Sequence, residues 1–233
     1  MLLAWYRCND NAASTAVEDA SGNGNHGTAA RNTSLTSVLG KLDNAYSTNG
    51  SSDFFTIPWT TTNAVWTFAC WVKPASIAAY QRLLFMNGTN HFYCGLQLNN
   101  AGKFSPNIGL YGAGSTYRNS NTTLSTTQWW HVAGVIYPAT PDILVYVNGE
   151  LDQGSLENNG PTNTSPVGLD IGRIKYSTAY YYGQQLIDDV RIYNGAIAAW
   201  QIKAIYNAGI GSYRYDPWRK EFGGNANRIR RVE

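Results

Sequence analysis

Apolar residues recur along the chain in short runs separated by glycine, asparagine, proline and serine. Trp66, Phe68, Cys70 and Val72 alternate with other residues, which is the period of a strand with one buried face. Many short runs with turn residues between them indicate a β-sandwich or β-barrel. We expect strands at Leu2–Tyr6, Ala45–Ser47, Phe54–Pro58, Trp66–Lys73, Arg82–Met86, Tyr93–Leu98, Trp130–Tyr137, Ile143–Val147, Gly168–Gly172 and Leu186–Tyr193.

The segments between the strands carry turn, helix and loop signals. Asn148-Gly149 supplies the two positive φ angles of a type I′ turn, which predicts a hairpin. Ala198–Asn207 places apolar residues at i, i+3 and i+4, so we expect one helix there, with Gly209 as its C-terminal cap. The polar segments Gly112–Gln128 and Gly154–Pro166 are typical of long surface loops.

A series of motifs follows the chain order of a known family. The motifs are Leu3–Tyr6, Asp19–Thr28, Asp53–Pro58, Trp66–Pro74, Trp129–Gly134, Leu144–Gly149 and Gly183–Asn194. In this order the chain resembles the laminin-G-like jelly-roll family of the concanavalin-A-like lectin/glucanase superfamily. The resemblance covers roughly residues 1–210 and is carried by the ordered set, since each motif alone is weak.

The resemblance implies an all-β fold, a two-sheet antiparallel jelly-roll sandwich over residues 1–212 with one short C-terminal helix. It also places the strand around Trp5 beside the strand Asp188–Tyr193. Residues 213–233 then form a basic C-terminal extension. Because the superfamily hosts lectins, adhesion modules, glucanases and structural domains, the fold alone does not decide the function.

Charge is distributed unevenly. The 233 residues carry a net charge of +2. From Tyr213 onward six basic residues stand against three acidic ones, so this stretch carries +3 and the remainder −1. Basic residues interleaved with acids are a poor footprint for nucleic acid, and docking onto an acidic protein neighbour is the better interpretation. The expected anchoring residues are Arg214, Trp218, Arg219, Phe222, Arg228, Arg230 and Arg231.

Cys8, Cys70 and Cys94 have no disulfide-framework spacing, so we expect reduced thiols. No stretch approaches the ~20 apolar residues of a membrane span. The first residues lack the basic leader and the apolar run of a secretory signal. If Met1 is the natural start, we expect synthesis in a cytoplasm.

A structural Ca²⁺ site is one hypothesis for the turn that begins at Asp19. Calcium takes six to eight oxygen ligands, which a turn rich in glycine and asparagine can offer at close range. The expected ligands are Asp19, Asn23, Asn25 and Asp188, together with backbone carbonyls of the turn. The alternative is a turn held by side-chain hydrogen bonds, with Asp188 or Asp189 paired with a base such as Arg191.

Catalysis is not expected. Glucanases of the resembled superfamily use acids at alternating strand positions, and this chain lacks a Glu-x-Asp-x-x-Glu motif. Glu150 and Asp152 directly follow the Asn148-Gly149 turn, where solvated turn charges are the simpler interpretation. His131 follows two tryptophans in a core strand, and we expect a structural role for it.

Tyrosines are the best candidates for ligand contact, because an aromatic face stacks on a sugar ring. The candidates are Tyr111, Tyr117, Tyr176, Tyr180 and Tyr181. Tyrosine is also enriched at protein interfaces, so that alternative stays open. Alternation along 180–182 places at least one of these tyrosines in the core.

We expect a non-catalytic surface-display or adhesion protein, a decoration or fibre component of a phage virion that acts by glycan or host-surface binding. Its partners would be capsid or tail proteins in an oligomeric assembly and a cell-surface glycan. The expected location is the virion surface after cytoplasmic synthesis, with an extracellular or cell-surface location as the alternative. The other functional hypothesis is a stand-alone carbohydrate-binding module, and a glycan-active enzyme ranks below both.

Overall fold

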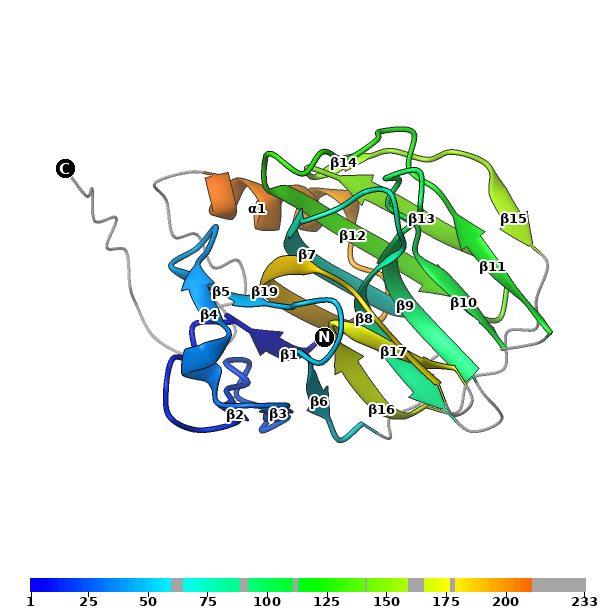
Figure 1. Cartoon of the computed structure of the whole chain (residues 1–233). Helices are drawn as coiled ribbons and strands as arrows, with labels where there is room; N and C mark the ends of the chain where they lie inside the picture. The colour runs from blue at the N-terminus through cyan, green and yellow to red at the C-terminus, as the bar shows by residue number, and fades with distance from the viewer. Residues whose placement is uncertain are drawn as a thin grey trace.

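The computed structural model describes residues 1–59, 65–88, 92–110, 113–140, 142–158, 166–176 and 179–210. Within them, two antiparallel sheets pack face to face, and one α-helix, α1 (Ala199–Ile210), lies outside the sheets (Figure 1). The prediction of an all-β two-sheet sandwich with one C-terminal helix is therefore confirmed.

The first sheet has eight strands in the described residues, and its core strand β7 lies between β12 and β19. In spatial order its strands are β14 (Glu150–Leu151), β13 (Asp142–Val147), β12 (Trp130–Tyr137), β7 (Trp66–Pro74), β19 (Gln185–Asn194), β5 (Asn44–Ser47) and β4 (Ser37–Leu39), with β1 (Leu2–Tyr6) also paired with β19. The expected pairing of the first strand with the last is confirmed, since Trp5 lies opposite Arg191.

The second sheet has nine strands in the same part of the chain. In spatial order they are β15 (Leu156–Asn158), β11 (Gly114–Arg118), β10 (Asn107–Leu110), β9 (Phe92–Leu98), β8 (Gln81–Gly88), β16 (Pro166–Ile171), β6 (Phe55–Ile57), β3 (Gly27–Ala29) and β2 (Ala16–Val17). A separate two-stranded hairpin consists of β17 (Arg173–Tyr176) and β18 (Ala179–Tyr182), and a short 3₁₀ helix, η1, spans Thr33–Leu35.

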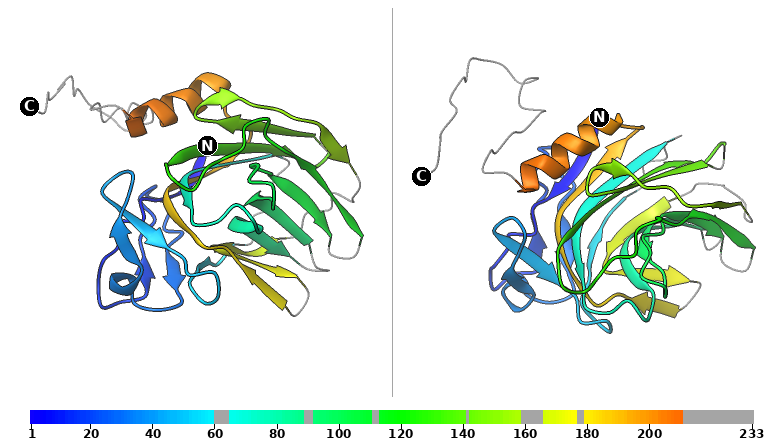
Figure 2. Two further views of the ribbon diagram at one scale, coloured as in Figure 1. Left: turned by 45° about the horizontal axis from the view of Figure 1, so that its top comes forward. Right: turned by 90° about the horizontal axis from the view of Figure 1, so that it is seen from above.

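The core lies between the two sheets and takes alternate residues from each strand. On β7, Trp66, Phe68, Cys70 and Val72 belong to this core, as their alternation predicts. The intervening Trp71 is also buried, at 1% exposure. Alternation predicted one buried face, but both are buried because α1 covers the outer face of this sheet (Figure 2).

The helix approaches the sheet closely at one residue. Gly209 lies inside α1 and does not cap it, so the predicted cap is wrong. A Cβ atom at Gly209 would come within 2.5 Å of the Trp71 Nε1 atom. Glycine is therefore required here by the contact with the Trp71 ring and not by a chain reversal.

Turn and loop predictions have mixed outcomes. The type I′ hairpin is confirmed, with φ of 51° at Asn148 and 78° at Gly149 between β13 and β14. The two segments expected to be long loops instead contribute β11 and β15, which pair with each other at the edge of the nine-stranded sheet. Both strands are short and polar, so they carry little apolar alternation for sequence to show.

The three cysteines are free and buried, in agreement with the expected reduced thiols. Burial raises the pKa of the Cys8, Cys70 and Cys94 thiols. Each therefore stays protonated and packs as a small apolar side chain.

Candidate functional site

The β17–β18 hairpin is flanked by two glycines, Gly172 after β16 of the nine-stranded sheet and Gly183 before β19 of the eight-stranded sheet. Gly172 has a φ of 90°, a backbone conformation that few residues other than glycine adopt. The Gly183 N–H donates to the Gly172 carbonyl over 2.9 Å, which closes the base of the hairpin. The Gly172 N–H donates to the Leu83 carbonyl over 2.8 Å, which fixes this base to β8.

The hairpin covers part of the outer face of the nine-stranded sheet, on the side of the sandwich opposite α1 (Figure 2). Leu84 and Met86 of β8 point into the core, so the intervening Phe85 points outward. Ile174 of β17 packs on Phe85 and Tyr93 and is fully buried. This small apolar cluster holds the hairpin against the sheet.

Arg173 adds a second anchor. Its guanidinium carbon lies 3.3 Å from the centre of the Phe54 ring and 4.3 Å from that of Tyr180. Its Nε atom donates to the Asp170 carboxylate over 2.8 Å. Burial raises the pKa of Asp170, although Arg173 and Asn87 partly offset that effect by hydrogen bonding. Arg173 thus fixes the Tyr180 ring to the sheet by contacts on two sides.

A hollow of about 490 Å³ opens beside the hairpin. Its lining residues define what we call the tyrosine hollow, and they are Gly50, Tyr80, Arg82, Tyr180, Tyr181 and Tyr182. Tyr80, Tyr180 and Tyr181 are 46%, 42% and 45% exposed, so their rings are open to solvent. The Arg82 guanidinium carbon lies 4.8 Å from the centre of the Tyr80 ring.

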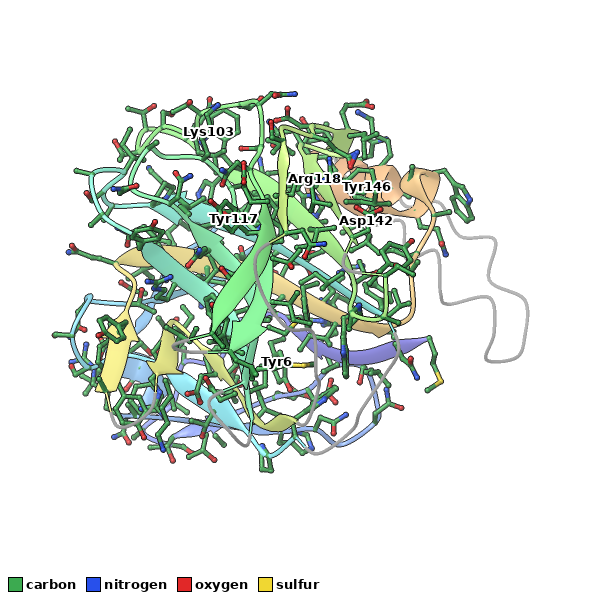
Figure 3. All side chains as sticks on the ribbon, turned by 90° about the vertical axis from the view of Figure 1, so that its right-hand side faces the viewer. Tyr6, Lys103, Tyr117, Arg118, Asp142 and Tyr146 are labelled. Carbon is green, nitrogen blue, oxygen red and sulfur yellow. The ribbon has the colours of Figure 1, made fainter. Side chains whose placement is uncertain are left out.

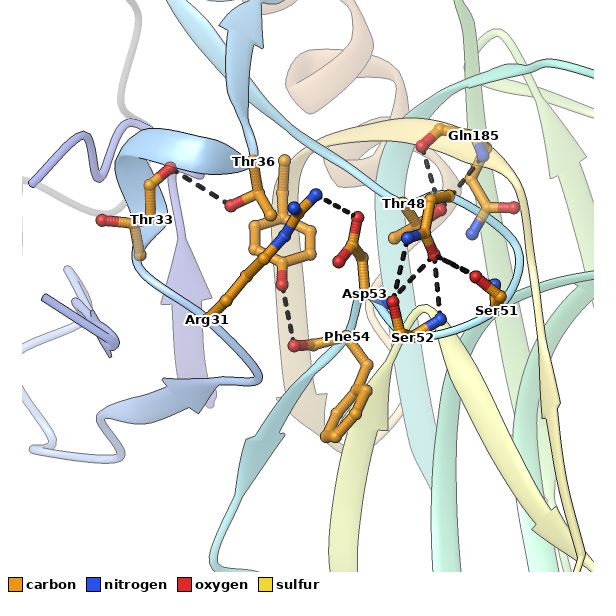
Figure 4. A network of polar contacts seen from close by, with 11 residues as sticks. Arg31, Thr33, Thr36, Thr48, Ser51, Ser52, Asp53, Phe54 and Gln185 are labelled. Carbon is orange, nitrogen blue, oxygen red and sulfur yellow. Dashed lines mark hydrogen bonds and ion pairs between the residues drawn. The ribbon is translucent and has the colours of Figure 1, made fainter. Parts of the chain in front are cut away.

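The polar loop between β5 and β6 also lines the hollow, through Gly50. Figure 4 shows the hydrogen bonds within this loop and to Gln185. The Asn49 side-chain oxygen accepts hydrogen bonds from the backbone N–H groups of Ser51, Ser52 and Asp53. Thr48 and Gln185 join the start of this loop to β19, since the Gln185 N–H donates to the Thr48 hydroxyl over 3.0 Å. These bonds stabilise the turn of the loop and join it to β19.

Arg82 links the hollow to the sheet. Arg82 lies opposite Gln97 on β9, and its guanidinium donates to the Gln97 side-chain oxygen. The Gln185 side-chain amide donates to the Arg82 carbonyl over 2.8 Å. These contacts with β9 and β19 therefore position the arginine of the described lining.

The predicted tyrosines do not form one cluster. Tyr180 and Tyr181 line the hollow, and Tyr176 lies on the same hairpin, although its side chain is outside the described part. Tyr117 lies on β11, half-buried, and is not among the residues that line the hollow (Figure 3). Tyr111 and the anchoring residues Arg214, Trp218, Arg219, Phe222, Arg228, Arg230 and Arg231 lie outside the described residues.

The expectation that one of residues 180–182 belongs to the core is wrong. Tyr180 and Tyr181 are exposed and Tyr182 is half-buried. The reason is that β18 pairs only with β17 in the described residues and belongs to neither large sheet. Sequence reasoning also missed Tyr80, which directly precedes β8, and Arg82, which lies near the start of β8.

The turn from Asp19 to Asn25 is held by hydrogen bonds. The Asp19 carboxylate accepts from the backbone N–H groups of Trp5, Ser21 and Asn25, each over 2.9 Å. The Asn23 and Asn25 side-chain amides donate to the Leu3 carbonyl over 3.0 and 2.9 Å. N–H groups on both Asp19 oxygens occupy positions that Ca²⁺ would need.

Asp188, the fourth expected ligand, is engaged elsewhere. One of its carboxylate oxygens accepts from the backbone N–H groups of Lys41 and Leu42 over 2.9 and 2.7 Å. The other oxygen is buried without a hydrogen-bond partner in the described residues. The neighbouring Asp189 carboxylate pairs with the Arg191 guanidinium over 3.2 Å. The four expected ligands therefore do not fit a preformed calcium site, and calcium binding stays a prediction.

The other polar residues considered as candidates make structural contacts. Glu150 forms an ion pair with Lys203, and Asp152 accepts from the backbone N–H groups of Asn121 and Thr122. His131 is fully buried against Trp71, and burial lowers its pKa to about 3. Among the described residues, no three His, Cys, Asp or Glu side chains gather as a metal site would require. The helix in that part of the chain is too short to cross a membrane.

The fold and the open aromatic hollow together define a lectin-like sandwich. A family model described as the concanavalin A-like lectin/glucanases superfamily matches residues 49–203. The chain belongs to this superfamily, of the laminin-G type. No curated protein matches the chain in sequence.

Solved structures of similar fold include three with different tasks. Domain 4 of AbnA, an extracellular arabinanase from Geobacillus stearothermophilus solved in complex with arabinotriose, has a TM-score of 0.62 at 22% identity, covering 88% of this chain and 98% of that one. The receptor-binding domain of botulinum neurotoxin C/D mosaic serotype has a TM-score of 0.63 at 16% identity, covering 89% and 51%. Trypanosoma rangeli sialidase has a TM-score of 0.63 at 17% identity, covering 91% and 34%.

These identities show a shared fold and nothing finer. The chain spans about half of the neurotoxin domain and about a third of the sialidase. The described architecture is thus one that carbohydrate-binding and receptor-binding domains share.

Proposed function

We propose that this protein is a non-catalytic binding module that recognises a glycan at the tyrosine hollow. The observation that carries the proposal is the exposure of Tyr80, Tyr180 and Tyr181 around one hollow. Sugar rings have an apolar face that stacks on aromatic side chains, and their hydroxyls bond to nearby polar groups.

The rigidity of the hollow supports this role. Tyr180 is held by Arg173, and Tyr80 by Arg82, so the rings need little ordering when a ligand binds. Each flexible side chain that must be immobilised costs about 0.5–1.5 kcal/mol of affinity. A hollow whose rings are already positioned avoids much of this cost.

The absence of acids from the hollow supports a non-catalytic role. Glycoside hydrolysis in most families needs two carboxylates within about 5–10 Å of each other. Among the described residues, the six that line the hollow include neither Asp nor Glu. Asp170 is held beneath the hairpin by Arg173 and is only 6% exposed.

A glycan array tests the proposal directly. We expect the wild-type protein to bind a subset of glycans and the Tyr181→Ala variant to lose at least about tenfold in affinity, since stacked aromatics carry much of such binding energy. Trp200→Ala is the matched control, because Trp200 is 67% exposed on α1, on the other side of the sandwich. A blank array, or equal losses in both variants, would contradict glycan recognition at the hollow.

We also propose that the module is displayed on a phage particle, where residues 213–233 would anchor it to capsid or tail proteins. This proposal rests on the basic and aromatic composition of that segment, which lies outside the described residues. Deleting residues 213–233 should abolish assembly onto the partner while the thermal transition of the sandwich is retained. Assembly that survives the deletion would contradict anchorage by this segment.

A further inference from the structure

We propose that residues 213–233 dock on the outer edge of the eight-stranded sheet, along β4 of the same chain. The inference goes beyond glycan recognition at the tyrosine hollow and does not depend on it. It follows from three observations: the unpaired side of β4, the apolar and acidic side chains around it, and the place where α1 ends.

Within the described residues, β4 ends the eight-stranded sheet and pairs with β5 alone. The Ser47 N–H of β5 donates to the Thr36 carbonyl, just before β4, over 2.8 Å. Successive residues of an antiparallel strand direct their N–H and C=O groups to opposite sides. The N–H and C=O groups of Ser37 and Leu39 therefore point away from β5, where an added strand would pair with them. We call this side of the strand the β4 edge.

Apolar side chains are exposed along the β4 edge. Leu39 is 84% exposed and Val38 38%, and Leu35 in the adjoining helix η1 is 62% exposed. A single exposed leucine is common on a protein surface, but an edge strand with several apolar side chains is one that natural sheets usually cover. An occupant of this edge would cover these side chains with apolar side chains of its own.

Carboxylates without an ion pair in the described part of the chain lie beside the β4 edge. They are Asp10, Glu18 and Asp43. The Asn9 side-chain amide donates to Asp43 at the β4–β5 turn over 3.5 Å, and the Glu18 N–H donates to Asp10 over 3.1 Å. Contacts thus link the three acids to one another and to the turn. Their negative charge attracts a basic occupant.

Residues 213–233 have the composition that complements this edge. They carry a net charge of +3, from six basic and three acidic residues. Trp218 and Phe222 supply large apolar side chains between the basic ones. Pairing at a strand edge uses main-chain groups, so it does not require an alternating sequence. The charge and the aromatic residues of this segment therefore match the acids and the leucines of the β4 edge.

The helix α1 ends beside the β4–β5 turn (Figure 1 and Figure 2). Gly209 packs on the Trp71 ring of β7, and the Lys41 ammonium of the turn lies 4.9 Å from the centre of that ring. From β7 the sheet runs through β19 and β5 to β4, three strand spacings or about 14 Å. The eight residues from Ile210 to Trp218 can reach about 26 Å. The segment therefore begins within reach of the β4 edge.

This short tether favours docking within one chain. A segment joined to its site by a short flexible linker has an effective concentration of about a millimolar, so at lower protein concentrations it outcompetes the segment of a second copy. Anchorage to a partner through the same residues would then require the partner to release the segment from the β4 edge.

Amide hydrogen exchange in the ¹⁵N-labelled full-length protein tests the contact residue by residue. We expect the outward amides of Ser37 and Leu39 to exchange at least about tenfold more slowly in the wild type than in a Trp218→Ala/Phe222→Ala double variant, because a docked segment bonds to them. The Val38 amide points to β5 and is the internal control, with one rate in both proteins. Outward amides that exchange in the wild type as fast as those of an unstructured peptide, or equally slowly in both proteins, would overturn the proposal.

Exchange at two protein concentrations shows whose segment docks. Docking within one chain predicts the same protection of Ser37 and Leu39 at about 0.05 and about 0.5 mM protein, because an intramolecular contact does not depend on concentration. Protection that is lost on dilution would assign the contact to a second copy and overturn docking within one chain.

Limited digestion with trypsin tests the same contact from the side of the segment, since Arg219 and Lys220 are cleavage sites. Leu39→Lys removes an apolar contact and repels a basic segment, so it should speed cleavage there about tenfold. Leu151→Lys is the matched control and should leave the rate unchanged, because Leu151 is 57% exposed on β14, at the opposite end of the same sheet. Thermal melting confirms that both variants are folded. Equal cleavage rates in the wild type and in both variants would overturn the proposal.

Discussion

The outer faces of the two sheets are covered in different ways. On the eight-stranded sheet, α1 buries Ala69, Ala133 and Val135 with its own Ile202 and Ile205. On the nine-stranded sheet, the β17–β18 hairpin buries only a small cluster through Ile174 and leaves the tyrosines beside it exposed. The helix completes the hydrophobic packing, while the hairpin presents side chains that the core does not use.

The polar side chains of the two outer faces also differ in their burial. His131 and Trp71 lie in contact beneath α1, and burial lowers the His131 pKa to about 3, so this imidazole stays neutral. On the open face, the Arg82 guanidinium donates to the Gln97 side-chain oxygen, and the Lys175 side chain is exposed. One outer face is therefore closed by packing, and the other carries the exposed aromatic side chains on which the proposed recognition rests.

The largest expected effect is on the covered face. Trp71→Ala should lower the free energy of unfolding by about 3–5 kcal/mol, because the ring is 1% exposed and packs on His131 and Tyr206. Tyr181→Ala should lower it by less than about 1 kcal/mol, because that ring is 45% exposed. Urea unfolding measures both variants, and similar losses in the two would break the comparison.

The next largest effect is expected where α1 lies close to the Trp71 ring. Gly209→Ala should destabilise the fold by about 1–3 kcal/mol, because the new Cβ would meet the Trp71 ring. Ala208→Gly, at the neighbouring helix position, should cost only about 1 kcal/mol through helix propensity. Thermal unfolding of the two variants distinguishes them, and a stabilised Gly209→Ala variant would contradict the packing of α1 on Trp71.

We expect the free energy of unfolding to depend on pH through Asp188. This residue lies opposite Trp71 in the pairing of β19 with β7. Burial raises its pKa from the ordinary 3.8 to about 7, and the charge of Asp189 adds to this, while N–H donation from Leu42 and Lys41 partly offsets it. The folded protein thus keeps this proton to higher pH than the unfolded chain does. Stability should therefore fall by about 1–3 kcal/mol as pH rises from about 4 to 7.

Asp188→Asn should remove this decline, since an amide oxygen can still accept from the loop at Lys41 and Leu42. Asp43→Asn is the control, because Asp43 is exposed in the same loop and its φ of 66° suits asparagine. Urea unfolding at pH 5 and pH 8 measures the difference. A decline as steep in Asp188→Asn as in the wild type would show that another group titrates.

The smallest expected effect concerns calcium. Because N–H groups already surround the Asp19 carboxylate, adding Ca²⁺ or a chelator should move the melting temperature by less than about 1 °C. Differential scanning calorimetry gives the answer. A rise of several degrees that a chelator reverses would establish the calcium site that the sequence predicts.

Sequence patterning predicted the strands of the core but not the hollow. The bounds of β1 and β12 agree with the predicted runs because apolar alternation records burial against the opposite sheet. The three tyrosines of β18 are consecutive, so they show no alternation, and they lie in a hairpin outside both sheets. Tyr80 and Arg82 join them only through long-range contacts such as Gly172 to Leu83, which local patterns do not record.

Chemical-shift mapping of the ¹⁵N-labelled protein with a glycan selected on the array tests the central claim most directly. We predict shifts at residues 79–82 and 179–183, around the tyrosine hollow, and none along α1. Shifts confined to α1 and β14, with the hairpin unchanged, would contradict the assignment of recognition to the open face.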